Sequence, residues 1–192
     1  RNRKAPDSSI QGPRLKKLHT VKDSRKEIFM KKILVSECLY GGRIVRYDGG
    51  DTTEKDPRFL KWKEEGRLVP ICPEVFGGLP TPRPDSQRVG DKVQTGAGVD
   101  VTKEYTLGAS EALRLAQENQ VAFAIMKQDS PSCGSKFIYD GTFTDTKKEG
   151  QGLAVEYLRN AGFTVFAEED IDETQRSEEH TSELQSLGNL VC

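Results

Sequence analysis

Apolar runs and stretches of mixed polarity alternate along the middle of the chain. Four apolar runs have the length of buried strands: residues 32–36, 68–71, 121–126 and 163–167. Three longer stretches between them predict helices: residues 56–65, 102–120 and 152–161. Glycine and proline mark the connections, notably a loop at residues 77–84 and a turn at residues 138–141. Because strands and helices alternate, the pattern predicts a single α/β domain of Rossmann-like type, with a mostly parallel sheet and helices on both faces.

Residues at the ends of the predicted helices support these limits. Pro57 suits the first position of a helix, and Gly66 suits the position that follows its last turn. Thr102 is a candidate N-cap, because its hydroxyl can accept a backbone N–H from the first turn. Within that long helix, positions such as Tyr105 and Ala109 recur at helical spacing, so they are expected to face the core.

The two ends of the chain differ from its middle. Residues 1–29 hold nine Lys or Arg against three Asp or Glu, a composition that suits a basic arm for nucleic acid. A disordered leader outside the natural product is the better interpretation, because Met30 opens directly into the first predicted strand. Residues 176–192 begin with a stretch similar to a translated sequencing adapter, so we expect disordered read-through there. The predicted domain is therefore residues 30–175.

Removing the two ends changes the charge balance. The whole chain has a net charge of −1, whereas residues 30–175 carry 19 basic and 24 acidic residues, a net of −5. That balance gives no basic surface for nucleic acid. No apolar run approaches the roughly 20 residues that a membrane-spanning helix needs, and no signal segment precedes Met30. The sequence therefore predicts a cytoplasmic protein in a reducing setting, without a membrane partner.

The same removal simplifies the inventory of possible metal ligands. Both histidines of the chain, His19 and His180, lie in the ends, and so does Cys192. The predicted domain keeps three cysteines and no histidine. Three thiols cannot all form disulfides with one another, and a disulfide framework is not expected in a reducing compartment.

Each remaining cysteine follows a predicted strand. Cys38 comes after the first strand, Cys72 directly after the second and Cys133 in the loop after the third. The carboxyl ends of parallel strands meet at one edge of a sheet, where open α/β sheets bind ligands. The loops are rich in Gly, Pro and Ser, so their backbone amides can approach an anionic group. We therefore expect the three thiols to converge in space.

Four kinds of chemistry are open to three such thiols. They can be buried structural cysteines, since free cysteine is commonly buried. A nucleophile normally needs a histidine base, although the spacing from Cys38 to Arg43 resembles a phosphate-binding nucleophile loop. Structural zinc normally takes four Cys or His ligands. An iron–sulfur cluster suits the inventory better, because three cysteines would leave one iron of a cubane open to solvent or substrate.

Longer motifs around these cysteines resemble a known family, the 2-thiouracil desulfurases. The resemblance covers residues 30–168, and the strings that begin at Cys72 and at Ser130 are its most specific part. It is carried by five strings: Val35-Ser36-Glu37-Cys38-Leu39, Arg46-Tyr47-Asp48-Gly49, Cys72-Pro73-Glu74-Val75-Phe76-Gly77-Gly78-Leu79-Pro80-Thr81-Pro82-Arg83, Ser130-Pro131-Ser132-Cys133-Gly134-Ser135 and Ile138-Tyr139-Asp140-Gly141-Thr142-Phe143.

The resemblance implies an enzyme with a [4Fe–4S] cluster on Cys38, Cys72 and Cys133, and one iron that the protein does not ligate. It implies catalytic roles for Glu74 and Ser130. The expected partner is a small thiolated nucleobase such as 2-thiouracil, which is hydrolysed to uracil and hydrosulfide without net electron transfer. A non-catalytic cluster protein that senses oxygen or redox state is the alternative function. The oligomeric state is not predicted.

The residues themselves agree with these roles, with one departure. In a domain without histidine, proton transfer needs a carboxylate, and Glu74 lies close to Cys72. The alternative for Glu74 is a loop carboxylate that caps a backbone amide or pairs with Arg83. Ser130 can relay a proton, or cap the turn before Pro131. Glu37, in contrast, stands beside Cys38 where the family usually has a small residue. Further candidate pocket residues are Arg46, Asp48, Arg83, Lys127 and Asp140.

Overall fold

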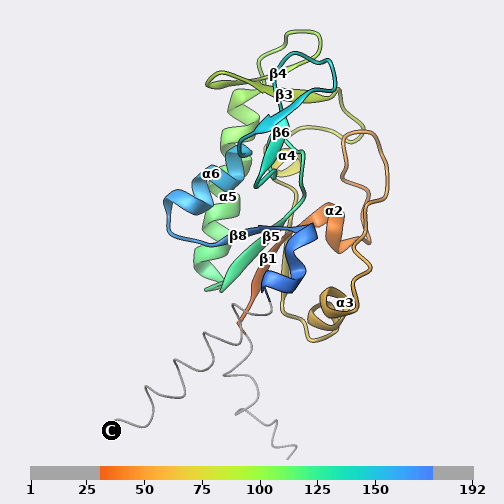
Figure 1. Ribbon diagram of the computed structural model, residues 1–192, viewed down its shortest axis with the longest axis vertical. Helices are drawn as coiled ribbons and strands as arrows, with labels where there is room; N and C mark the ends of the chain where they lie inside the picture. The colour runs from red at the N-terminus through yellow and green to blue at the C-terminus, as the bar shows by residue number, and fades with distance from the viewer. Residues whose placement is uncertain (1–30, 175–192) are drawn as a thin grey trace, which may run out of the picture. The chain divides into compact units, whose positions relative to one another are not determined.

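The computed structural model describes residues 31–174, and it is built around one four-stranded parallel sheet (Figure 1). The order of the strands across the sheet is β2-β1-β5-β8. Their bounds are β1 (Ile33–Ser36), β2 (Leu68–Ile71), β5 (Phe123–Met126) and β8 (Val165–Ala167). The predicted α/β class and all four strands are confirmed, with the last two shorter than expected. The expectations for residues 1–29 and 176–192 lie outside the described residues.

Helices cover both faces of the sheet, as the sequence predicts. The face that carries Leu34 packs against α5 (Thr102–Glu118) and α6 (Leu153–Asn160), largely through alanines of the two helices. The face that carries Ile33 and Val35 packs against α3 (Pro57–Glu64) through Phe59 and Trp62. Within residues 31–174, no helix has the length and apolar character needed to cross a membrane.

The helix ends follow the predicted chemistry in one case and depart from it in another. Pro57 opens α3, and the side chain of Asp56 accepts the N–H of Arg58 at 2.8 Å as its N-cap. The prediction that Thr102 caps α5 is wrong, because Thr102 is the first residue of the helix. Its hydroxyl instead accepts the N–H of Val93 at 2.9 Å, which ties the helix start to a neighbouring strand.

Several short elements were not predicted, because they lack the length that gives a periodic signal. Two antiparallel hairpins and three short helices lie between the main elements. Their bounds are α2 (Glu37–Tyr40), α4 (Pro73–Phe76), β3 (Ser86–Val89), β4 (Lys92–Thr95), β6 (Phe137–Tyr139), β7 (Lys147–Glu149) and η1 (Glu168–Asp170). The turn expected at residues 138–141 begins later than predicted, since residues 138 and 139 belong to β6 and the connection to β7 starts at Asp140.

Glycine lets α4 approach the long helix α5 at backbone distance. A Cβ placed on Gly108 of α5 would lie 1.9 Å from the carbonyl oxygen of Pro73, the first residue of α4. A Cβ on Gly77, which follows α4, would lie 1.9 Å from the carbonyl oxygen of Glu104. Two backbones thus meet where no side chain fits. This close contact fixes the position of α4, which carries Glu74.

Candidate active site

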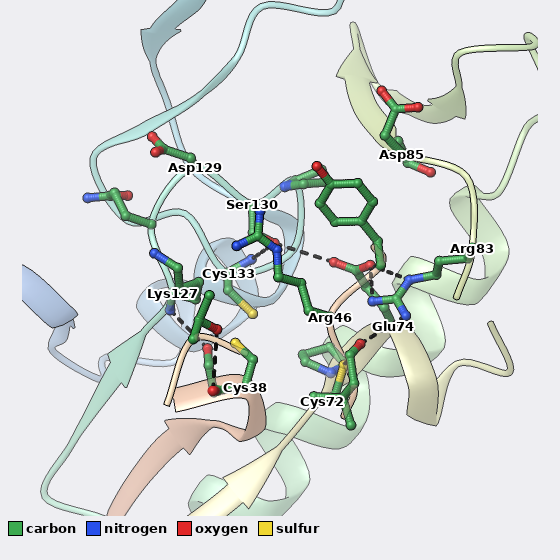
Figure 2. Close-up of a pocket in the computed structure, with 18 of the residues that line it drawn as sticks. Cys38, Arg46, Cys72, Glu74, Arg83, Asp85, Lys127, Asp129, Ser130 and Cys133 are labelled. Atoms are coloured by element: carbon green, nitrogen blue, oxygen red, sulfur yellow. Dashed lines mark hydrogen bonds and ion pairs between the residues drawn. The ribbon is translucent and has the colours of Figure 1, made fainter. Parts of the chain in front are cut away.

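The three cysteines line one pocket of about 270 Å³ at the carboxyl edge of the sheet (Figure 2). Cys72 is the N-cap of α4, and Cys133 lies in the turn that follows β5. Cys38 lies within the one-turn helix α2 rather than in an open loop, which corrects the expectation from sequence. Convergence of the three thiols, inferred from their places after parallel strands, is confirmed by this shared pocket.

Burial makes these thiols poor nucleophiles by themselves. It raises the pKa of Cys38 and of Cys133, and it raises the pKa of Cys72 to about 11. Hydrogen bonds from Thr52 to Cys38 and from Ser36 to Cys133 lower the pKa of each thiol, but burial outweighs them. A nucleophilic cysteine needs an environment that favours the thiolate. The pocket therefore argues against the nucleophile interpretation.

The thiols surround the pocket without meeting at one point. Among residues 31–174, no three His, Cys, Asp or Glu side chains are gathered closely enough to hold a single metal ion. A site for one zinc ion would need ligands at about 2.0–2.3 Å from one centre. A group with several metal atoms can take one thiolate at each of several corners. The donor set, three thiols and no histidine, thus fits a cluster better than a single ion.

The turn that carries Cys133 is closely packed from two sides. A Cβ on Gly134 would lie 2.6 Å from the carbonyl oxygen of Phe137. Gly152, the N-cap of α6, lies against Ser132 and Cys133, and a Cβ there would approach the carbonyl carbon of Ser132 to 2.3 Å. The fixed backbone keeps the Cys133 thiol at its place in the pocket.

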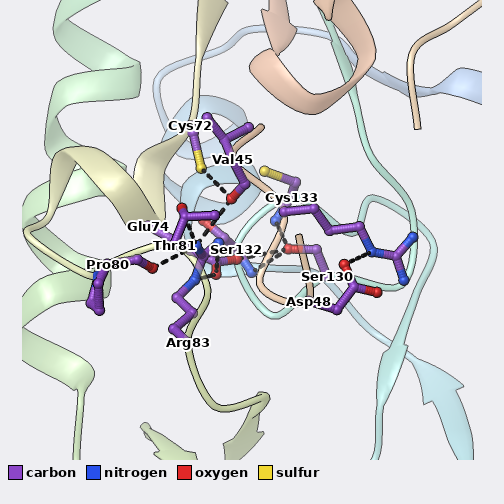
Figure 3. A network of polar contacts seen from close by, with 11 residues as sticks. Val45, Asp48, Cys72, Glu74, Pro80, Thr81, Arg83, Ser130, Ser132 and Cys133 are labelled. Carbon is purple, nitrogen blue, oxygen red and sulfur yellow. Dashed lines mark hydrogen bonds and ion pairs between the residues drawn. The ribbon is translucent and has the colours of Figure 1, made fainter. Parts of the chain in front are cut away.

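Glu74 lies in the same pocket and forms a buried ion pair with Arg83 (Figure 3). Nε of Arg83 donates to Oε2 of Glu74 at 2.8 Å, and Nη2 donates to the same oxygen at 2.7 Å. The exposed fractions of the two side chains are 5% for Arg83 and 12% for Glu74. Glu74 therefore pairs with Arg83, which was one of the roles considered for it from the sequence. The pairing holds its carboxylate inside the pocket.

Ser130 connects this carboxylate to the Cys133 turn. Its hydroxyl donates to Oε1 of Glu74 at 3.4 Å, a long hydrogen bond. The same Oγ accepts the N–H of Ser132 at 3.1 Å and that of Cys133 at 3.0 Å. The cap of the turn considered from the sequence is therefore present, and the same hydroxyl also contacts a pocket carboxylate.

Tyr105 is a pocket residue that sequence reasoning placed in the apolar core. It is 1% exposed, and it hydrogen-bonds with Glu74 and Ser86. Burial, followed by the negative charge of Glu74, raises its pKa well above the ordinary value. Helical spacing correctly indicated an inward side chain, but it carried no information on where the hydroxyl would point. The one available signal was a phenol among the alanines of that helix face.

The opposite side of the pocket carries two cationic residues. Figure 2 shows Lys127 on the side away from Arg83, with Arg46 reaching across the cysteines between them. Lys127 pairs with Glu168, which also accepts the N–H of Gln128 at 2.7 Å. Nε of Arg46 lies 3.0 Å from Asp48. These cations place positive charge beside the thiols.

Asp140, another candidate from the sequence, does not line the pocket. Its carboxylate accepts the N–H of Thr142 at 2.8 Å and the hydroxyl of the same residue at 2.6 Å. A nearby residue, Asp145, lines the pocket instead. The structure thus gives Asp140 a turn-capping role.

Glu37, the departure from the family pattern, has its own arginine partner. Oε1 of Glu37 lies 2.8 Å from Nε of Arg43, and Oε2 accepts Nη2 of Arg43 at 2.8 Å. The side chain of Arg43 is 62% exposed, whereas Glu37 lines the pocket. Arg43 is thus engaged by a carboxylate rather than presented as a phosphate ligand beside Cys38. The charge that Glu37 adds to the pocket wall is matched by Arg43.

Comparison with known proteins places the chain among relatives. A family model described as 2-thiouracil desulfurase matches residues 33–170. The chain belongs to the 2-thiouracil desulfurase family. Within this family, it is 38% identical over 151 residues to the uncharacterized protein YbbK of Bacillus subtilis (strain 168), over 73% of this chain and 98% of that protein.

A solved structure extends the likeness to three dimensions. The [4Fe-4S]-dependent thiouracil desulfidase TudS matches with a TM-score of 0.73 and 44% sequence identity. The match covers 74% of this chain and 94% of that chain. The family assignment and the α/β fold predicted from sequence are confirmed by these two comparisons.

Proposed function

We propose that this chain is a [4Fe–4S]-dependent desulfurase that hydrolyses a thiolated pyrimidine such as 2-thiouracil. Water replaces the sulfur on carbon, so the products are the oxo-pyrimidine and hydrosulfide, with no net electron transfer. The observation that carries the proposal is one pocket that joins a buried thiol, Cys133, and two half-buried thiols to an Arg-held carboxylate and a serine. The family match and the named activity of TudS support it.

Cys38, Cys72 and Cys133 are the proposed ligands of the cluster. Three thiolates on a four-iron cubane leave one iron without a protein ligand, which supplies a Lewis-acidic position for the sulfur of a substrate. The cationic side chains of Lys127 and Arg46 offset negative charge in this pocket. The polar side chains of Thr52 and Ser36 act to lower the pKa of Cys38 and Cys133, against the larger effect of burial.

Glu74 and Ser130 are the proposed catalytic residues. Several carboxylates line the pocket, and Glu74 is the one whose Oε1 faces Ser130, so it is the proposed acceptor of a proton from the attacking water. Ser130 is fixed by the two N–H groups that its oxygen accepts, so its hydroxyl proton is directed toward Glu74. The pair can therefore pass a proton between the water and the pyrimidine ring.

Anaerobic purification followed by assays for iron, sulfide and released hydrosulfide tests the proposal. We expect a brown protein with about four irons per chain that converts 2-thiouracil to uracil and hydrosulfide in equal amounts. A brown protein that is inert toward thiolated pyrimidines would support the redox-sensor alternative. A colourless protein after anaerobic reconstitution would contradict both functions.

A further inference from the structure

We propose that Arg83 is a positioning residue that holds one oxygen of Glu74, so that the other oxygen acts as the proton acceptor. The inference rests on the proposed function, because it assigns a base to the hydrolysis. It goes beyond an ion pair that neutralises charge. Arg83 would determine which carboxylate oxygen of Glu74 accepts the proton and where that oxygen lies.

The two oxygens of Glu74 have different partners. Both hydrogen bonds from the Arg83 fork, at 2.8 Å and 2.7 Å, end on Oε2. Oε1 is left to face the hydroxyl of Ser130 at 3.4 Å. A carboxylate whose oxygens are equivalent can exchange them by rotation about its last carbon–carbon bond. Two donors on Oε2 remove this freedom, because rotation would break both hydrogen bonds.

Arg83 is itself fixed by the surrounding backbone (Figure 3). Its Nη1 donates to the carbonyl oxygen of Val45 at 3.0 Å, to that of Pro80 at 3.1 Å and to the hydroxyl of Thr81 at 3.3 Å. Its backbone N–H donates to the carbonyl oxygen of Tyr47 at 2.8 Å. A planar guanidinium can donate hydrogen bonds to Glu74 and to the backbone at the same time, whereas a lysine ammonium is a single charged group on a flexible side chain.

These contacts tie the base to the thiol site. The carbonyl oxygen of Val45 that accepts from Arg83 also lies 3.9 Å from the sulfur of Cys72, so Arg83 and Cys72 share one backbone neighbour. The segment from Val45 to Tyr47 carries Arg46, which lines the pocket. Arg83 therefore connects the carboxylate of Glu74 to the parts of the pocket lining that carry Cys72 and Arg46. A displaced Arg83 would move the base relative to the bound sulfur compound.

The test compares Arg83→Met and Arg83→Lys with a matched control, Arg88→Met. Arg88 pairs with Glu156 at 2.8 Å away from the pocket, so its loss removes an arginine–carboxylate pair without touching the site. A base misplaced by about 1 Å costs about 100-fold. In the anaerobic hydrosulfide assay we expect kcat to fall about 100-fold in Arg83→Met and less in Arg83→Lys. KM and iron content should stay close to those of the wild type, and Arg88→Met should keep full activity.

Each other outcome overturns the inference. An unchanged kcat in Arg83→Met at full iron content would show that Glu74 needs no positioning by Arg83. A rise in KM alone would make Arg83 a substrate-binding residue. Loss of iron in Arg83→Met and also in Arg83→Lys, with Arg88→Met fully loaded, would make Arg83 structural.

The proposed function can fail separately. If the loaded wild-type protein does not act on thiolated pyrimidines, the hydrolase assignment falls. The placement of Glu74 is then decided by a crystal structure of Arg83→Met. We expect the carboxyl group to leave its position beside Ser130, and an unmoved Glu74 would overturn the inference.

Discussion

Two acid–arginine pairs lie beside two of the pocket cysteines, and they differ both in the exposure of the arginine and in which carboxylate oxygens it binds. Arg43 binds both oxygens of Glu37, whereas both donors of Arg83 end on Oε2 of Glu74. Glu37 precedes Cys38 and pairs with Arg43 at 2.8 Å. Glu74 follows Cys72 and pairs with Arg83 at 2.7 Å. The arginine of the first pair is 62% exposed, whereas that of the second is 5% exposed.

The difference shows that hydrogen-bond distance alone does not rank these pairs. In an exposed pair, water and salt screen the charges, and holding two long side chains together costs conformational freedom. In a buried pair, loss of one partner leaves an uncompensated charge away from water. The Glu37 pair therefore neutralises a charge of the pocket wall through an exposed arginine, whereas the Glu74 pair holds its carboxylate in a fixed position through a buried one.

Replacement of each glutamate by its amide gives the largest expected contrast. Glutamine keeps the size of the side chain but cannot accept the proton. Because a general base contributes about 10²–10⁴-fold, we expect Glu74→Gln to lower kcat in that range and Glu37→Gln to leave it close to wild type. The measurement is hydrosulfide release per bound iron under anaerobic conditions. Equal losses in the two variants would contradict the distinction between the pairs.

Double-mutant cycles compare the coupling energies of the two pairs. Each cycle uses the Glu→Gln and Arg→Met variants and follows the free energy of unfolding in denaturant. We expect a coupling of about 2 kcal/mol for Glu74 with Arg83, as for hydrogen bonds between charged buried groups. For Glu37 with Arg43 we expect about 0.5 kcal/mol. A larger coupling in the Glu37 pair would reverse the comparison.

The hydroxyl residues Ser130 and Thr52, beside Cys133 and Cys38, give a smaller expected difference in stability. Ser130 caps the Cys133 turn through two N–H groups, so Ser130→Ala should destabilise the fold by about 1 kcal/mol. The hydroxyl of Thr52 caps no turn in this way, and it donates a single hydrogen bond to the carbonyl oxygen of Cys38 at 3.3 Å. Thr52→Val should therefore cost about half as much. Thermal unfolding of the three proteins, read with their iron content, checks the order.

Salt concentration gives the smallest expected effect. A rise from low ionic strength to about 1 M shortens the Debye length to about 3 Å. The coupling in the Glu37 pair should then fall toward zero, while that in the Glu74 pair should change little. The cycles above, repeated in high KCl, measure this. An equal loss of coupling in both pairs would show that water reaches Arg83.

Sequence patterns predicted the framework of the site because that framework follows periodicity and topology. Four apolar runs became the four parallel strands, and parallel strands bring their carboxyl ends to one edge. That rule alone was enough to gather Cys38, Cys72 and Cys133. The resemblance to the family then supplied Glu74 and Ser130, which lie within hydrogen-bonding distance of each other.

The rest of the site depends on contacts that no local pattern encodes. The hydroxyl of Tyr105 reaches Glu74 only because α4 packs on α5. Arg83 was one partner considered for Glu74, but whether the two would pair depended on how the loop from 77 to 84 folds back. Asp140 was expected in the pocket, but it caps its own turn, and Asp145 of the same connection lines the pocket instead. Tertiary packing decides such cases.

The glycine contact between α4 and α5 has a consequence for how the protein tolerates variation. Gly108 has no side chain, and its Cα lies against the carbonyl oxygen of Pro73, the residue before Glu74. Any larger residue there would push α4, which carries Glu74, away from α5. In a library of random variants screened for desulfurase activity, we therefore expect substitutions of Gly108 to be as damaging as substitutions of the pocket residues, although Gly108 lies on α5 and outside the pocket.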